Sequence, residues 1–221
     1  HMVLQGGESD EGIGGNILIE SGTGLVQTGS ISINTANEDL ASVTGDLTLS
    51  TGYTASGPTG SININTGESK PGSSNRAGSI SVAAGTSSSG IGATITLSAG
   101  NAATSTGGAV TVTTGSGHST KGSGTLTLQS QAADGGGTSG PISMRSGSAN
   151  GNSGKVSVTT GASLTGRAGN VEVLNGVTGV GVGADVIIEA GSSTGIVGSA
   201  TGGRITISSG EGTLSSSGDL G

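Results

Sequence analysis

One short motif recurs along most of the 221-residue chain and constrains its fold more than any other feature. The motif reads glycine, any residue, aliphatic, any residue, aliphatic, any residue, small residue, glycine. Thirteen copies can be aligned, and successive copies begin 14 to 19 residues apart. A regular period of this kind indicates a repeat architecture, in which no single unit can bury its apolar face alone.

Each repeat contributes two aliphatic side chains, which we call its aliphatic pair. The thirteen pairs are Ile17/Ile19, Ile31/Ile33, Leu47/Leu49, Ile62/Ile64, Ile80/Val82, Ile95/Leu97, Val110/Val112, Leu126/Leu128, Ile142/Met144, Val156/Val158, Val171/Val173, Val186/Ile188 and Ile205/Ile207. These 26 positions hold 25 of the 44 Ile, Val and Leu residues, together with Met144. A disordered linker has no reason to concentrate its aliphatic residues in this way, so the pattern indicates a folded array.

The aliphatic residues alternate with Ser, Thr or Asn in most repeats, and this period of two predicts short strands with one buried face. Glycine precedes the predicted strand in eleven repeats and follows it in eleven. Glycine at such places indicates either a positive φ or the close approach of another backbone. We therefore predict an all-β fold, a parallel β-solenoid of about 13 short strands with turn-forming linkers between them.

Two strands per coil is the favoured arrangement, because each aliphatic pair then faces an apolar surface across the coil. One strand per coil, an antiparallel meander and an intertwined trimer remain open alternatives. Neither end of the chain resembles a polar cap, so we expect a segment of a longer array that tends to stack end to end.

The composition makes this fold depend on more than aliphatic burial. The chain has 48 glycines and one tyrosine, Tyr53, and it lacks Phe, Trp and Cys. Aromatic side chains supply much of the buried area of ordinary cores, and glycine loses the most conformational freedom when a chain folds. A stable solenoid would therefore need continuous ladder hydrogen bonds, and some linkers are expected to be mobile.

The charge balance excludes two classes of partner. Seven Lys and Arg residues stand against fourteen Asp and Glu residues, which gives a net charge of −7. Nucleic acids and anionic membrane surfaces require a basic stripe, and no apolar run reaches the ~20 residues of a membrane-spanning helix. We therefore expect neither nucleic-acid binding nor membrane insertion.

The predicted organisation is a single repeat domain over residues 15–210, flanked by an N-terminal edge at 3–14 and a C-terminal edge at 211–221. His1-Met2 resembles a remnant of cloning, so the natural N-terminus is expected to have been removed together with any targeting signal. The absence of cysteine excludes a disulfide framework and thiolate chemistry.

No cluster of catalytic side chains is evident, and we predict neither an enzyme nor a cofactor or metal site. His118 is the only histidine beyond His1, and it is interpreted as a solvated loop residue rather than a catalytic base. The acidic groups Glu38-Asp39 and Glu8/Asp10/Glu11 are interpreted as solvated turns rather than cation sites.

Threonine pairs on successive predicted strands form the only candidate binding surface. They are Thr94, Thr96, Thr111, Thr113, Thr125 and Thr127. On a solenoid such a rank could order water into an ice-like lattice, as in some antifreeze solenoids. The simpler interpretation is that threonine suits exposed β positions, and charged residues such as Arg145 and Lys155 interrupt the surface.

The recurring string resembles Gly/Ser/Thr-rich tandem arrays of predicted secreted and surface proteins of marine microalgae, bacterial adhesins and phage fibres. This resemblance covers residues 15–210 and implies an extracellular or cell-surface scaffold, a rigid spacer or an adhesive stalk. The expected partners are other copies of the chain, end to end or side by side, and polysaccharide or mineral surfaces. The alternative function is ice binding through the threonine pairs.

Overall fold

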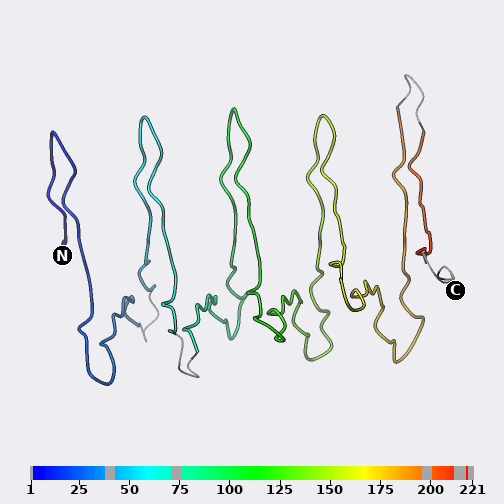
Figure 1. The fold of residues 1–221 in the computed structure, drawn as a ribbon, viewed down its shortest axis with the longest axis horizontal. Helices are drawn as coiled ribbons and strands as arrows, with labels where there is room; N and C mark the ends of the chain where they lie inside the picture. The colour runs from blue at the N-terminus through cyan, green and yellow to red at the C-terminus, as the bar shows by residue number, and fades with distance from the viewer. Residues whose placement is uncertain (1, 38–42, 71–75, 196–200, 212–217, 219–221) are drawn as a thin grey trace. The chain divides into compact units, whose positions relative to one another are not determined.

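The computed structural model shown in Figure 1 describes residues 2–37, 43–70, 76–195, 201–211 and 218. Throughout these residues the backbone forms turns, bends and extended segments, and no helix or β-strand occurs among them. The prediction of a parallel β-solenoid is therefore wrong, and so is the prediction of two strands per coil. The thirteen repeats are present as extended segments, but no sheet joins them within the described chain.

The chain divides into two units, His1–Thr111 and Val112–Gly221. Within each unit, extended segments run out and back in pairs and are joined by tight turns (Figure 1). The boundary between the units falls between the two members of the Val110/Val112 repeat, from Thr111 to Val112. The predicted domain limits at residues 15 and 210 remain predictions.

The segments are joined by a recurring contact, which we call the neck. At a neck, the residue that begins one repeat donates its backbone N–H to the carbonyl of the glycine that ends the segment before it. Seven necks carry this bond, with N···O distances of 2.7–3.3 Å: Gly15 to Gly7, Gly29 to Gly22, Ala93 to Gly85, Gly108 to Gly100, Gly124 to Gly115, Gly203 to Gly191 and Gly218 to Gly210. Each neck thus closes one linker into a loop.

Close packing at the necks explains why most repeats begin with glycine. A Cβ atom placed on Gly108 would lie 3.3 Å from the Cβ of Ala99, and one placed on Gly203 would lie 3.4 Å from the Cβ of Ala190. The same approach to the small residue of the preceding repeat recurs at Gly29, Gly60, Gly78, Gly124, Gly154, Gly169 and Gly218. Of the two roles predicted for the flanking glycines, close approach therefore operates at most glycines that begin a repeat, whereas a Cβ on closing glycines such as Gly22, Gly100 and Gly191 would meet no atom within 4 Å.

Positive φ angles serve a different purpose, because they fall inside the linkers. Among the described glycines, Gly57, Gly135, Gly136 and Gly181 have φ between 66° and 108°. Gly135 and Gly136 form a turn that Asp134 opens and the Gly137 N–H closes, 3.4 Å from the Asp134 carbonyl oxygen. Only glycine adopts such angles without a steric penalty, so these positions determine how the linkers turn.

Serine side chains stabilise two further linker turns. The Ser87 hydroxyl oxygen accepts the Gly90 N–H at 2.9 Å, and the Ser163 hydroxyl oxygen accepts the Gly166 N–H at 3.0 Å. A short hydroxyl side chain that bonds to the backbone three residues later is a common turn device. The predicted linkers are therefore turns, and they use the local chemistry that their Ser/Gly composition indicates.

The absence of a sheet from the described residues has a local cause. A strand pair requires hydrogen bonds that continue along both segments, whereas each of the seven necks contributes one. Beyond the neck, each repeat has only two aliphatic residues with which to attract its neighbour. Two paired segments are marginal in water even when their side chains are large, and ordering this many glycines carries a high entropic cost.

Because the aliphatic contacts are too few to offset the entropic cost of ordering the glycines, the described chain has no core. No described side chain is buried, and the accessible surface is 21990 Å². A compact protein of 20.5 kDa would expose about 8,800 Å², so this chain exposes roughly two and a half times that surface. The necks therefore organise the backbone locally without enclosing apolar side chains.

A pair of glycine substitutions tests the neck. A Cβ placed on Gly15 would lie 2.7 Å from the Gly7 nitrogen, whereas one placed on Gly7 would meet no atom within 4 Å. We expect Gly15→Ala to remove the bond from Gly15 N–H to Gly7 O and to lower the amide protection of residue 15 about fivefold, in line with a net hydrogen-bond energy of ~1 kcal/mol.

The matched control for this neck is Gly7→Ala, which should keep the protection of residue 15 near that of the unmodified chain. Amide hydrogen exchange followed by NMR provides the measurement. Equal protection in both variants would show that the close approach between Gly15 and Gly7 does not determine this contact.

Candidate interaction surface

The thirteen aliphatic pairs form the most regular surface feature of the chain. The first member of each pair is 48–65% exposed and the second is 58–79% exposed. In every pair the first member is the less exposed of the two. It lies two positions after the residue that begins the repeat, whereas the second member lies three positions before the start of the following linker.

Aliphatic residues of the linkers are exposed to a greater degree. Leu25, Val26, Ile91, Leu164 and Val177 have relative exposures of 100–107%. Relative exposure thus distinguishes the aliphatic pairs from these linker residues, although neither group is buried. The aliphatic pairs are partly covered in a repeated way, and the linker residues lie fully in solvent.

The small position of the motif lies two residues after the second aliphatic residue. It is half-buried in four of the thirteen repeats, at Thr35, Ala84, Ala99 and Ala190, and exposed in the others. Gly6 and Ser69 are the other described residues with intermediate burial, while the rest of the described chain is exposed. Ala99 and Ala190 each pack against the glycine that begins the next repeat.

The predicted threonine surface lies in solvent. Thr94, Thr96, Thr111, Thr113, Thr125 and Thr127 are all exposed. The first three belong to unit His1–Thr111 and the last three to unit Val112–Gly221. Their hydroxyls are available to a partner, and the alignment of the six residues in one rank stays a prediction.

The candidate chemical groups are also exposed. His118 lies in a turn where the Lys121 N–H bonds to the His118 carbonyl at 3.1 Å and Ser119 has a φ of 57°. Glu8, Asp10 and Glu11 are exposed, and Glu38-Asp39 lie outside the described residues. The described part of the chain contains no group of three or more potential metal ligands.

Both ends of the chain carry a contact that sequence analysis missed. The bonds from Gly15 to Gly7 and from Gly218 to Gly210 repeat the neck, although residues 3–14 and 211–221 were assigned to edges. Counting back from Gly7 by the motif places Met2 and Leu4 at the positions of an aliphatic pair, and Gly6 at the small position. The half-buried state of Gly6 fits this register.

In the linker after Val173, a side chain rather than a backbone N–H donates the hydrogen bond that closes the loop. The Asn175 amide nitrogen donates to the Ala184 carbonyl at 2.7 Å and closes the loop between them. This loop holds Val177, Val180 and Val182, which are 94–103% exposed. The bond could not be expected from sequence, because Ala184 stands where most repeats begin with glycine.

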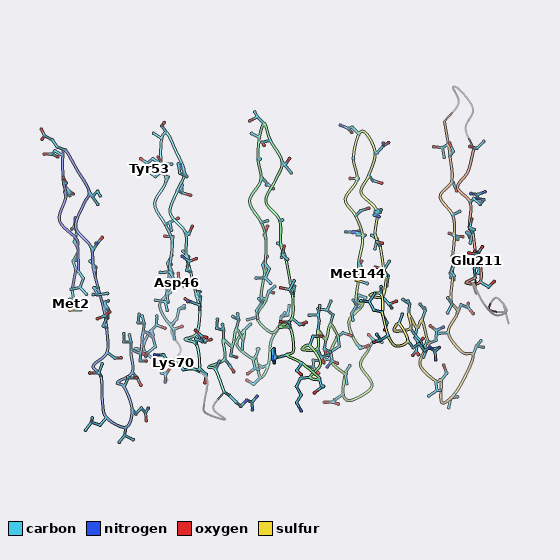
Figure 2. All side chains as sticks on the ribbon, viewed as in Figure 1. Met2, Asp46, Tyr53, Lys70, Met144 and Glu211 are labelled. Carbon is cyan, nitrogen blue, oxygen red and sulfur yellow. The ribbon has the colours of Figure 1, made fainter. Side chains whose placement is uncertain are left out.

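The described residues form no pocket, and no helix among them is long and apolar enough to cross a membrane. What the chain presents is a set of repeated side chains, visible along the extended segments in Figure 2. The candidate site is therefore a repeated surface with two components, the aliphatic pairs and the exposed hydroxyl groups.

The chain was compared with protein families, curated proteins and solved structures. No family model, curated protein or solved structure matches it. The resemblance to tandem arrays of surface proteins consequently remains an expectation based on the motif.

The exposure of Met144, a member of an aliphatic pair, can be measured chemically. Met144 is 70% exposed and Met2 is 86% exposed (Figure 2 labels both). Because thioether oxidation follows exposure, we expect hydrogen peroxide to oxidise the two residues at rates within about twofold in dilute protein. Peptide mass spectrometry resolves them, since cleavage after Arg76 releases the fragment with Met2, and cleavage after Lys121 and Arg145 releases the one with Met144. Strong protection of Met144 in monomeric protein would contradict the exposed state of the aliphatic pairs.

Proposed function

We propose that the chain is a non-enzymatic structural module, an extracellular or cell-surface scaffold or adhesive stalk that acts through many weak, repeated contacts. The observation that carries this proposal is the recurrence of one surface thirteen times. Contacts that are individually weak become strong together when they are linked in one chain. A repeated surface of this kind is suited to a partner that is itself repetitive, such as a polysaccharide or a mineral.

The exposed hydroxyl groups supply the chemistry for such contacts. Thr96, Thr111 and Thr127 each lie between the two members of an aliphatic pair, and all three are exposed. Hydroxyl groups both donate and accept hydrogen bonds, which matches the hydroxyl surfaces of polysaccharides and hydrated minerals. Of the thirteen residues at this central position, Glu172 alone is charged, so the contacts are predominantly neutral.

Ice binding is the competing function, and the exposed threonine pairs favour it in part. It requires hydroxyl and methyl groups held in a flat rank of fixed spacing, which a sheet would provide. No strand occurs in the described residues, so this support for ice binding is lacking. The scaffold function requires repetition but no flat rank, and we therefore prefer it.

One six-site variant tests both functions. The variant replaces six threonines by valine, which removes the hydroxyls and preserves the side-chain shape: Thr94, Thr96, Thr111, Thr113, Thr125 and Thr127. We expect adsorption of the full chain to cellulose or silica particles to weaken at least about tenfold, because a multivalent contact loses six hydrogen-bonding groups. Adsorption isotherms measured for each material provide the test.

The matched control replaces six exposed linker threonines by valine: Thr23, Thr28, Thr104, Thr138, Thr165 and Thr178. This control should adsorb like the unmodified chain. Failure of the unmodified chain to adsorb to either material would contradict the adhesive role. Ice shaping that the six-site variant loses and the control keeps would assign ice binding instead.

A further inference from the structure

Exposed aliphatic surface is the feature that the proposed function leaves unexplained. We propose that the aliphatic pairs are a self-association surface, on which a second copy of this chain packs side by side. The inference rests on the proposed function as a structural module and adds how the module is assembled. Soluble monomers rarely expose contiguous apolar patches of more than a few hundred Å², and larger ones mark interaction sites.

The amount of exposed surface supports assembly. The chain exposes about 13,000 Å² more than a compact protein of its mass would. A stable interface buries about 1,600 Å² in total, so a small part of this excess is sufficient. All 26 members of the aliphatic pairs are at least 48% exposed and have area left to bury.

The regular spacing of the pairs indicates what the partner is. The pairs recur every 14 to 19 residues, and a partner must present apolar groups at matching intervals to cover them all. Another copy of the chain meets this condition without any additional assumption. The aliphatic pairs of the second copy are exposed in the same way, so a single interface would bury the pairs of both copies.

The charges around the pairs are compatible with close packing of two copies. The residue between the two aliphatic side chains is charged in one repeat of thirteen, at Glu172. Charged residues are depleted at the centres of protein interfaces, where they would lose their hydration. Seven further charged residues directly adjoin a pair, but along an extended backbone they leave on the side opposite to the aliphatic side chains: Glu20, Asp46, Arg145, Lys155, Asp185, Glu189 and Arg204.

The two units differ in charge, and this difference favours one relative arrangement of the copies. Unit His1–Thr111 contains eight acidic and two basic residues, a net charge of −6, while unit Val112–Gly221 contains six acidic and five basic residues, a net charge of −1. Repulsion between copies is smallest when the first unit of one copy lies beside the second unit of the other. We infer this staggered or antiparallel pairing.

The first test is the oligomeric state of the unmodified full chain. Sedimentation velocity from about 1 µM to about 300 µM should show a concentration-dependent transition from monomer to a larger species, as expected for micromolar association. A chain that stays monomeric up to the highest concentration overturns the inference.

Substitution of valine by threonine locates the surface, because the two side chains have the same shape. The test variant replaces Val110, Val112, Val156 and Val158, which belong to aliphatic pairs. Each copy then buries four hydroxyls that lack partners, so the concentration for half-assembly should rise at least about 100-fold.

The control variant replaces Val26, Val43, Val177 and Val180, linker residues that are 94–103% exposed. It carries the same four chemical changes outside the aliphatic pairs and should assemble like the unmodified chain. Equal weakening of assembly in both variants, or no change in either, would overturn the assignment of the surface.

Met144 reports on the same surface without any substitution. In dilute protein it should be oxidised at the rate set by its 70% exposure, and above the assembly concentration that rate should fall at least about fivefold. N-acetylmethionine amide in the same solution controls for the peroxide concentration. An oxidation rate that stays constant through the transition would show that assembly leaves this pair exposed, contrary to the inference.

Salt dependence tests the arrangement of the copies. Because both copies are acidic, screening should promote assembly, and raising NaCl from about 0.02 M to about 0.3 M should lower the half-assembly concentration about threefold. Assembly that weakens with added salt would show that attraction between charges holds the copies together, which contradicts an apolar contact.

These outcomes are distinguishable from the outcomes of the adsorption test. A chain that adsorbs to cellulose or silica as a monomer retains the proposed function and loses the inference. A chain that assembles but adsorbs to neither material retains the inference and loses the adhesive role.

Discussion

The hydrogen bond at the neck is the interaction on which the rest of the described structure depends. It joins the start of one repeat to the glycine that ends the segment before it, at N···O distances of 2.7–3.3 Å. At most necks one side lacks a Cβ and the other carries a small side chain, as at Gly108 and Ala99, while the neck that begins at Ala93 has the longest bond, 3.3 Å. This contact explains the glycine that begins most repeats and how the linkers between bonded residues close into loops.

The repeat register could be predicted from sequence, because it is local, whereas two roles remained open for the flanking glycines. The structure has a close approach between a starting glycine and a small residue at Gly78, Gly124 and Gly203 among others. The serine turns at Ser87 and Ser163 follow from composition as well. The solvated state predicted for His118 is confirmed by its exposed turn.

The sheet could not be predicted correctly, because alternation of aliphatic and polar residues measures only the tendency of a segment to be extended. A ladder also requires neighbours that bond along their whole length, and pairs such as Ile62/Ile64 provide too little apolar contact to hold them in register. The bond from Asn175 to Ala184 escaped prediction for a different reason. It joins the small position of one repeat to the starting position of the next, where Asn175 and Ala184 replace the usual small residue and glycine.

The two components of the repeated surface have complementary physical properties. The aliphatic pairs favour removal from water, whereas residues such as Thr96 and Thr127 lose little by remaining hydrated. Along an extended backbone, successive side chains leave on opposite sides, so both components can operate at once. A module built in this way can associate through one side and present hydroxyl groups on the other.

The local nature of each neck has a consequence for how such a chain can change. The bonded residues are only seven to twelve positions apart, so no neck depends on another elsewhere in the sequence. Duplication or loss of a whole repeat therefore leaves every remaining neck intact and requires no compensating substitution. Copy number can therefore vary by gain or loss of repeats that share the motif, and the length of the module becomes a property that selection can adjust in steps of one repeat.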